Sequence, residues 1–340
     1  MVRWQNIIRP AWVAGVLCMA LHVWVTPLAA QEQKGSSEAQ RYSFTEAHLG
    51  TIVRLVFYSD DRERAKALAK RCFDRVRQLD AVFSDYRDDS ELTKLCKVAH
   101  KQATPVSDEL FAVLLSAEKI SEQSNGAFDV TMGASTREWR RQKQGGSSEV
   151  VGSLASVGCQ ALVLDELQKT VHFKKSLSLD LGGIAKGYIA DELAGLLQNG
   201  GVNDLAVAVG GEMVLVGSPP ELKGWSIGLE GPDQKVIASV ELSEVALSTS
   251  GDSYQFAEID GKRSAHVLDP DTAKGKQDRL NVTVIAPTAM QADAWATALR
   301  VLGVEKGNAL ADKEDSIEVM FAPAQGEVVT TKGFPVLTAR

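Results

Sequence analysis

The order of the expected helices and strands constrains the fold of this 340-residue chain more than any other feature. Two long amphipathic segments come early, at 60–83 and 107–124, with apolar residues at helical spacing. Short strand-like segments dominate the second half, and only two further helices interrupt them, at 184–199 and 289–302. Helices and strands do not alternate regularly, which predicts an α+β fold with mixed sheets and packed helices. The expected strands are 51–57, 161–164, 170–173, 205–209, 225–229, 236–242, 246–249, 281–286 and 317–321.

Residues 1–30 have the layout of a secretory signal peptide. Arg3 and Arg9 precede an apolar run at 11–25, and small residues end at Ala30 before the sequence becomes polar. The run is short for a membrane span, which needs about 20 apolar residues. We expect cleavage after Ala30, export to the periplasm, a flexible leader at 31–41 and one domain at 42–340. An uncleaved membrane anchor is the alternative.

The composition excludes two classes of site. The net charge of −7 and the lack of a basic cluster argue against nucleic-acid binding, which needs Lys and Arg to neutralise phosphates. Cleavage after Ala30 would leave Cys72, Cys96 and Cys159, an odd number without metal-ligand spacing. We therefore expect the cysteines to be buried as small apolar residues, with at least one free thiol.

The polar segment 142–149 is expected to be a long exposed loop.

The segment 178–188 has features of a phosphate site. A strand-like run ends in Asp180, and Gly182 and Gly183 come before the expected helix. Paired glycines let the backbone approach a ligand closely, and a helix N-terminus attracts anions through its free N–H groups. Lys186, one turn into the helix, is placed to reach the same anion. An ordinary strand-to-helix turn would also explain the glycines, so both interpretations stay open.

The helix expected at 289–302 is almost wholly apolar, yet it carries Asp293 and Thr297. Residues four apart lie on one helix face, and a carboxylate and a hydroxyl so placed suit a hard cation such as Mg²⁺. The alternative is a solvent-facing pair. The Ala, Trp and Leu residues around them indicate a buried helix, and a buried carboxylate needs a partner. This favours the metal interpretation.

A third group of polar residues comes late in the chain. Asp252 ends the segment 246–252, and His266 stands shortly before an Asp-Pro turn. Such a turn places an imidazole at the mouth of a site, although a hydrogen-bonded structural histidine is the alternative. The chain has no GxSxG segment to support a serine-hydrolase triad.

Together these segments resemble the ApbE family of FAD:protein FMN transferases, from about residue 49 to residue 303. The most specific matches are DLGGIAKGY (180–188), STSGD (248–252), HVLDP (266–270) and VTVIAPTAMQADAWATALRVLG (282–303). Several motifs in the order of the family argue against a chance match.

The resemblance implies a set of site residues. The metal ligands of the family fall on Asp293, Thr297 and the carbonyl of Gly183. Its catalytic position falls on His266; imidazole titrates near working pH, so His266 is the candidate base and Asp252 a weaker rival. The flavin contacts fall on Leu49, Tyr86, Ala127, Phe128, Asp129, Asp180, Lys186 and Leu268, with the Tyr86 ring stacked on the isoalloxazine.

The resemblance also implies an activity: Mg²⁺-dependent transfer of FMN from FAD to a threonine hydroxyl of an acceptor protein, with AMP as the second product. Family acceptors carry a Ser/Thr-Gly-Ala-Thr motif in membrane redox subunits, and 132–135 (MGAS) is too different for self-flavinylation. An FAD pyrophosphatase, in which water replaces threonine, stays open as an alternative. A non-catalytic flavin-binding protein is a second alternative, and the intact Asp293 and Thr297 pair argues against it.

Four departures from the family pattern concern the flavin pocket. Leu49 replaces a methionine, Val130 a proline, Glu212 an aspartate of a Gly-Gly-Asp segment, and Ala273 a glycine. None removes an expected metal ligand. The Leu49 and Ala273 changes put the fine shape of the pocket in question, but not the class of reaction.

Overall fold

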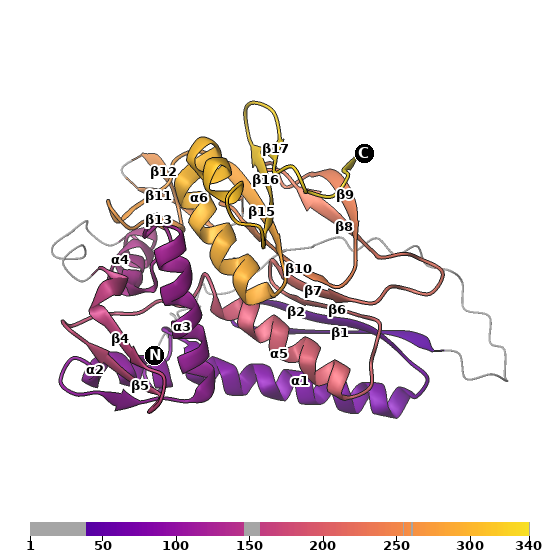
Figure 1. The fold of residues 1–340 in the computed structure, drawn as a ribbon, viewed down its shortest axis with the longest axis horizontal. Helices are drawn as coiled ribbons and strands as arrows, with labels where there is room; N and C mark the ends of the chain where they lie inside the picture. The colour runs from indigo at the N-terminus through magenta and orange to yellow at the C-terminus, as the bar shows by residue number, and fades with distance from the viewer. Residues whose placement is uncertain (1–38, 146–156, 254, 260, 340) are drawn as a thin grey trace, which may run out of the picture.

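The computed structural model describes residues 39–145, 157–253, 255–259 and 261–339. Its centre is an eight-stranded antiparallel sheet in the order β1-β2-β6-β7-β10-β15-β16-β17 (Figure 1). The strands are β1 (Gln40–His48), β2 (Thr51–Ser59), β6 (Leu205–Val209), β7 (Glu212–Val216), β10 (Val245–Ser250), β15 (Leu280–Ala286), β16 (Glu318–Pro323) and β17 (Val329–Thr330).

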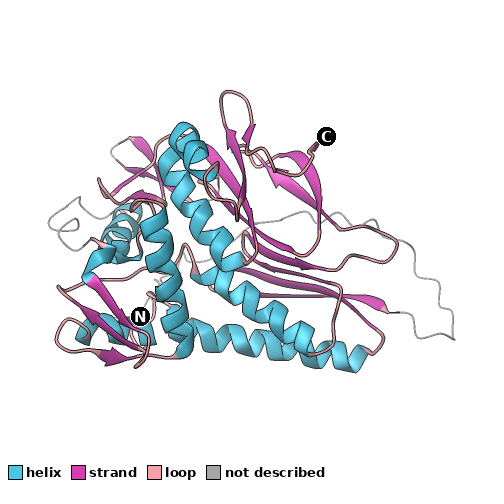
Figure 2. Cartoon of the chain, in the orientation of Figure 1, coloured by secondary structure: helices cyan, strands magenta, loops and turns pink. Residues whose placement is uncertain are grey.

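Both faces of this sheet are covered. Helices α1 (Arg62–Phe83), α5 (Ala185–Asn199) and α6 (Ala289–Ala311) pack on one face. A small sheet of β8 (Trp225–Glu230), β9 (Val236–Leu242) and β18 (Thr338–Ala339) packs on the other (Figure 2). Alternation along β2 fits both cores: Val53, Leu55 and Phe57 face the helices, and Val56 faces the small sheet.

A second group of elements lies near the C-terminal end of α1, at the lower left of Figure 1. It contains α2 (Glu91–Val98), α3 (Asp108–Gln123) and α4 (Gly133–Lys143), with the sheet of β3 (Thr104–Pro105), β5 (Thr170–Phe173) and β4 (Leu162–Asp165). Short helical turns cover Val130–Met132 and Cys159–Ala161. Two hairpins flank it: β11 (Phe256–Ile259) with β12 (Lys262–Ala265), and β13 (Leu268–Asp269) with β14 (Lys274–Gly275).

Side-chain caps fix where the expected helices begin. Asp61 accepts hydrogen bonds from the N–H groups of Glu63 and Arg64 at the start of α1, and Ser107 caps α3 in the same way. Gly303, at φ 77° and ψ −178°, interrupts α6. The first straight part of α6 therefore ends at residue 302, as the sequence predicted, and a second helical part continues to Ala311.

The α+β class is confirmed, and every expected strand and helix is present, with bounds shifted by one or two residues apart from the continuation of α6 beyond Gly303. The elements that were not expected include β1, β7, α2 and α4, together with the short strands β3, β11, β12, β13, β14, β17 and β18. Strand β1 begins at Gln40, inside the predicted leader 31–41, and α4 takes up Gln142 and Lys143 of the predicted loop 142–149. The signal segment 1–30, the leader up to residue 38 and residues 146–149 lie outside the described residues. Within the described residues, no helix combines the length and apolar character needed to cross a membrane.

The three described cysteines are free thiols, as the sequence analysis expected for at least one of them. Cys72 and Cys159 are buried and Cys96 is half-buried. Burial raises the pKa of the Cys72 and Cys159 thiols to about 12, so both remain protonated and pack as small apolar groups.

Candidate functional site

The glycine turn before α5 is held by the carboxylate that precedes it. Asp180 Oδ1 accepts a hydrogen bond of 2.7 Å from the N–H of Gly182, and the N–H of Asp180 donates to the carbonyl of Val130 at 2.8 Å. Helix α5 then begins at Ala185. The expected turn and helix are therefore present, with Gly182 and Gly183 just before a 15-residue helix. The strand-like run before them is not a strand: β5 ends at Phe173, and residues 176–181 have no regular secondary structure.

Three charged side chains meet where α5 crosses α6. Lys186 Nζ lies 3.1 Å from Glu212 Oε1 and 3.4 Å from Asp293 Oδ2, and it donates to the carbonyl of Gly182 at 2.7 Å. Asp293 Oδ2 also accepts the N–H of Gly187 at 3.2 Å. Asp293 and Glu212 are 3% and 4% exposed. The buried carboxylate of Asp293 thus has the partner that its apolar surroundings require.

Burial sets the ionisation of this cluster. It raises the pKa of Glu212 to about 8, with Lys186 opposing the shift and Asp293 adding to it. It also raises the pKa of Asp293, again against the attraction of Lys186. For Lys186 burial favours the neutral amine, but the two carboxyl groups outweigh it and raise the pKa above its usual value. Glu212 Oε2 is buried without a hydrogen-bond partner among the described residues, so the cluster has capacity for another cationic or donor group.

The predicted metal ligands lie together beside this cluster. Asp293 and Thr297 are one turn apart on α6, and an added Cβ atom at Gly183 would stand 2.9 Å from Thr297 Oγ1. A carboxylate, a hydroxyl and a nearby backbone carbonyl are the hard oxygen donors that Mg²⁺ prefers, and the unpartnered Glu212 oxygen is consistent with a cation there. Within the described residues, no three His, Cys, Asp or Glu side chains cluster as metal ligands. The donor set therefore fits a cation that keeps water or substrate ligands.

A carboxylate from α5 fixes the start of α6. Asp191 Oδ1 and Oδ2 accept the N–H groups of Ala289 and Met290 at 2.8 and 2.9 Å. These are unpaired donors of the first helical turn, and burial raises the pKa of Asp191 to about 6 against these bonds. The two helices that carry Lys186 and Asp293 are thereby tied together at the site.

Two tight turns come together at the edge of the charged cluster. The β1–β2 turn contains Leu49 at φ 55°, a left-handed conformation that is costly for a leucine. The N–H of Gly210, in the β6–β7 turn, donates to the carbonyl of Ile52 at 2.9 Å. A Cβ atom at Gly210 would lie 3.0 Å from Thr51 Oγ1 and 3.4 Å from Glu212 Oε2. The Leu49 turn, a predicted flavin contact, is thus next to the phosphate-compatible cluster.

His266 is oriented by a backbone carbonyl. Its Nδ1 lies 3.0 Å from the carbonyl oxygen of Gln255. Because a carbonyl only accepts, Nδ1 carries the proton, and Nε2 is left with its lone pair. Burial, together with the charges of Lys186 and Arg300, lowers the pKa of His266 to about 4, although the hydrogen bond with the Gln255 carbonyl opposes the shift. His266 is therefore a neutral imidazole whose accepting nitrogen is Nε2.

Asp252, the rival base, is sequestered. It is 0% exposed, and Arg263 Nε donates to its Oδ2 at 2.8 Å. Arg263 Nη2 also donates to the Asp252 backbone carbonyl at 2.6 Å. A carboxylate enclosed in this ion pair is poorly placed to reach an acceptor hydroxyl, so the geometry favours His266 as the base.

Tyr86 is exposed for ligand contact and supported from one side. The ring is 77% exposed, and the guanidinium carbon of Arg140, from α4, lies 4.1 Å from the ring centroid. The same guanidinium donates to Asp85 and, at 3.0 Å, to Asp180 Oδ2. Arg140 therefore links the Tyr86 loop to the glycine turn.

The other predicted flavin contacts are more enclosed. Ala127 and Phe128 are buried. Asp129 accepts from the backbone N–H groups of Thr131 at 2.7 Å and Cys159 at 3.0 Å, so its carboxylate braces two loop segments. Leu268 is buried in a small cluster with Met132, Trp139 and Ala257. The structure thus gives Asp129 and Leu268 structural contacts of their own.

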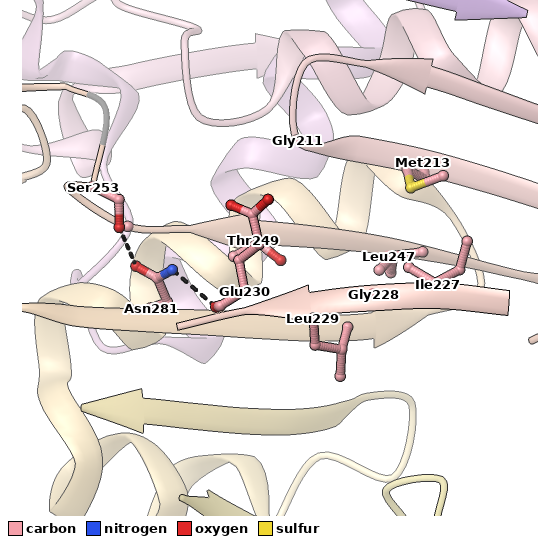
Figure 3. Close-up of a pocket in the computed structure, with 11 residues that line it drawn as sticks. Gly211, Met213, Ile227, Gly228, Leu229, Glu230, Leu247, Thr249, Ser253 and Asn281 are labelled. Carbon is pink, nitrogen blue, oxygen red and sulfur yellow. Dashed lines mark hydrogen bonds between the residues drawn. The ribbon is translucent and has the colours of Figure 1, made fainter. Parts of the chain in front are cut away.

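A small cavity of about 60 Å³ lies between the central sheet and β8 (Figure 3). Its walls include Met213, Ile227, Leu229 and Leu247. At its polar end, Asn281 Nδ2 donates to the carbonyl of Glu230 at 3.0 Å, and Ser253 Oγ lies 3.2 Å from Asn281 Oδ1. No predicted site residue lines this cavity, which is apart from the charged cluster although Gly211 borders it.

Sequence reasoning missed several residues that build the site. Glu212 was noted only as a departure from a family pattern, and Arg140, Asp191, Gln255 and Arg263 were not singled out. Only Glu212 could have been identified from the sequence. It follows two glycines and precedes an apolar run, a pattern that predicts a buried carboxylate. The others act through contacts between residues far apart in sequence, which spacing does not reveal.

Comparisons with known proteins establish the family of this chain. The ApbE family model matches residues 49–321. The FAD:protein FMN transferase of Klebsiella pneumoniae (strain 342) is 32% identical over 295 residues, covering 82% of this chain and 83% of that protein. The flavin transferase ApbE from Vibrio cholerae has a TM-score of 0.77 at 28% identity, over 87% of this chain and 98% of that one. The apo form of Pseudomonas stutzeri flavinyl transferase ApbE gives 0.77 at 30% identity, over 86% and 95%. This chain therefore belongs to the ApbE family.

Proposed function

We propose that this protein is an FAD:protein FMN transferase that moves FMN from FAD to a threonine hydroxyl of an acceptor protein and releases AMP. The observation that carries the proposal is the junction of α5 and α6. There Lys186 contacts both Asp293 and the carbonyl of Gly182, and Thr297 lies against Gly183. The Lys186 charge also acts on the neutral imidazole of His266 and helps to lower its pKa. This combination suits a pyrophosphate and a base.

The residues around the glycine turn would bind the pyrophosphate of FAD. The positive charge of Lys186 and the N-terminal end of the α5 dipole would both attract phosphate oxygens. Asp293, Thr297 and the Gly183 carbonyl would hold Mg²⁺, which offsets negative charge on the pyrophosphate and on the departing AMP. The exposed ring of Tyr86 would support the isoalloxazine.

His266 would take the proton from the acceptor. The threonine oxygen forms a bond to the FMN-side phosphorus, the bond to the AMP oxygen breaks, and Nε2 of His266 accepts the hydroxyl proton. The Nδ1 contact with the Gln255 carbonyl keeps Nε2 free for this task. Asp252 would serve as a structural anchor and not as the base.

We further propose that the protein acts after export, in the periplasm, on a membrane redox subunit carrying a Ser/Thr-Gly-Ala-Thr motif. The basic and apolar layout of residues 1–30 supports export. N-terminal sequencing of the mature protein should begin at Gln31. A protein that keeps Met1 and sediments with membranes would indicate the uncleaved anchor instead.

Product analysis separates this function from its alternatives. The protein is incubated with FAD and Mg²⁺, with and without an acceptor domain that carries the motif. A transferase gives flavin-labelled acceptor and AMP, only when the acceptor is present. An FAD pyrophosphatase gives free FMN and AMP in both samples, and a flavin-binding protein leaves FAD unchanged. An acceptor with its motif threonine changed to valine is the control for the linkage site.

A further inference from the structure

A single side chain, that of Arg263, contacts both Asp252 and Phe256. Arg263 Nε and Nη2 donate to the carboxylate and the carbonyl of Asp252 at 2.8 and 2.6 Å. The guanidinium carbon of Arg263 lies 3.5 Å from the ring centroid of Phe256. Arg263 is on β12, whose Ala265 pairs with Phe256.

The backbone carbonyl of Gln255, next to Phe256 in the chain, makes two contacts with His266. The backbone N–H of His266 donates to it at 3.3 Å, and the imidazole Nδ1 lies 3.0 Å from it. The direction of this one carbonyl therefore fixes both the backbone position and the protonated nitrogen of His266. If the carbonyl turned away, the imidazole would lose the contact that distinguishes Nδ1 from Nε2.

We infer that Arg263 is a positioning residue for His266: it holds Asp252 and Phe256 in place so that the Gln255 carbonyl, next to Phe256, keeps the imidazole in the Nδ1–H tautomer. This inference rests on the proposed function, in which Nε2 of His266 accepts the acceptor proton. Arg263 does not reach the reacting atoms in this scheme. It acts through Gln255, and Asp252 is the buried anchor that holds the guanidinium in place.

The side chain has to be an arginine for this task. The planar guanidinium donates from two of its edges to Asp252 while its face covers Phe256, an arrangement that a lysine ammonium cannot reproduce. Lysine would keep the charge opposite Asp252 but lose the second hydrogen bond and the stacked contact. Methionine would lose all three interactions while keeping a comparable length.

Loss of Arg263 should act locally. Ser253 stays attached to the body of the protein through Pro232, whose carbonyl accepts from Ser253 Oγ at 3.1 Å, and through Gln234, which donates to the Ser253 carbonyl at 2.8 Å. The residues freed by the loss of Arg263 would be Gln255 and Phe256. The expected effect is therefore a change in the imidazole and not a loss of the fold.

The test compares the tautomer of His266 with the rate of transfer in four variants. Arg263→Met and Arg263→Lys change the contacts of this side chain, and Phe256→Leu removes only the stacked face at a half-exposed position. Arg75→Met is the matched control, because Arg75 is another ion-paired arginine, 24% exposed against 26% for Arg263, that bridges α1 to Glu109 and Glu192. Nitrogen-15 NMR near neutral pH reports the tautomer, and His266→Gln identifies its signals among the five histidines of the chain.

We expect wild type and Arg75→Met to show a single Nδ1–H tautomer. Arg263→Met should show a mixture of tautomers and lose about tenfold to a hundredfold in kcat, short of the full contribution of a general base, with little change in KM for FAD. Arg263→Lys and Phe256→Leu should have a tautomer ratio and a kcat between those of wild type and Arg263→Met. The inference is overturned if Arg263→Met or, should it fail to fold, Phe256→Leu keeps the wild-type tautomer and kcat. A full rate in folded His266→Gln would instead reject the base assignment in the proposed function.

Discussion

The backbone of Gly183 lies against the side chain of Thr297, so close that a Cβ atom at Gly183 would stand 2.9 Å from Thr297 Oγ1 and 3.2 Å from its Cγ2. Threonine has few χ1 alternatives in a helix, so an alanine at residue 183 would displace either the glycine turn or the Thr297 hydroxyl. Gly183→Ala should therefore raise the Mg²⁺ concentration needed for half-maximal transfer. Titration of the rate with Mg²⁺ measures this.

Gly195→Ala is the matched control for that experiment. Gly195 is also on α5, and a Cβ atom there meets nothing within 4 Å. Alanine should leave the Mg²⁺ dependence unchanged and stabilise the protein by roughly 0.5–1 kcal/mol, because glycine is unfavourable inside a helix. Equal Mg²⁺ dependence in Gly183→Ala and wild type would count against Gly183 and Thr297 as neighbouring ligands.

The parts of the fold that could be predicted follow from local sequence. The helical spacing in α1 and α3, the caps Asp61 and Ser107, and the apolar β15 each contain their own signal. Helix α4 was missed because its sequence is mostly polar, with only three buried residues. Strand β1 was missed because its residues are half-exposed or exposed at this edge of the sheet. Neither segment shows a strong apolar pattern.

His266 and Asp252 should respond differently to substitution. His266→Gln is expected to lose about 10²- to 10⁴-fold in single-turnover rate at saturating FAD, the usual contribution of a general base, with little change in FAD affinity. Asp252→Asn keeps an oxygen that accepts from Arg263 Nε and should stay within about tenfold of wild type, since the buried carboxylate is only an anchor in this scheme. The reverse ranking of the two variants would make Asp252 the base.

The imidazole of His266 should stay neutral in mildly acidic solution. Burial, with Lys186 and Arg300, lowers its pKa from 6.5 to about 4. The folded protein then binds this proton less readily than the unfolded chain does. The contribution of this pKa shift to the free energy of unfolding is therefore complete above pH 6.5, and it is lost as the pH falls from 6.5 towards 4.

An NMR titration of the free protein checks this prediction. The His266 signal should not shift between pH 7 and about 5.5, a range in which an ordinary imidazole titrates. The free energy of unfolding of His266→Gln should fall less over the same range than that of wild type. A His266 midpoint near pH 6.5 would contradict the neutral imidazole expected from its lowered pKa.

Tyr86 should contribute to FAD affinity through its ring and not through its hydroxyl. Tyr86→Ala is expected to weaken FAD binding by about 0.5–1.5 kcal/mol beyond the lost area, and Tyr86→Phe should bind like wild type. Isothermal titration calorimetry measures both. Since Arg140 lies against the ring, Arg140→Met should also weaken binding. Wild-type affinity in Tyr86→Ala would make the tyrosine an ordinary surface residue.

The candidate site could be predicted from the sequence only in part, for a physical reason. Asp293 and Thr297 share a helix face, so their spacing places them together. Lys186 meets Glu212 and Asp293 only because α5 crosses α6 and the β6–β7 turn closes over both. The clamp of Arg263 on Asp252 likewise depends on a hairpin that folds back on β10. Such contacts are set by the packing of the elements, which no local pattern encodes.

The most direct test of FMN transfer at this site is the intact mass of an acceptor domain after incubation with FAD, Mg²⁺ and enzyme. With wild type, the acceptor should gain the mass of FMN less one water, on its motif threonine. With Asp293→Asn, which keeps the side-chain shape but removes the charged oxygen donor, it should gain nothing at limiting Mg²⁺. Circular dichroism should show the variant folded. An unmodified acceptor with the wild-type enzyme, or full modification by folded Asp293→Asn, would contradict the proposed chemistry of this site.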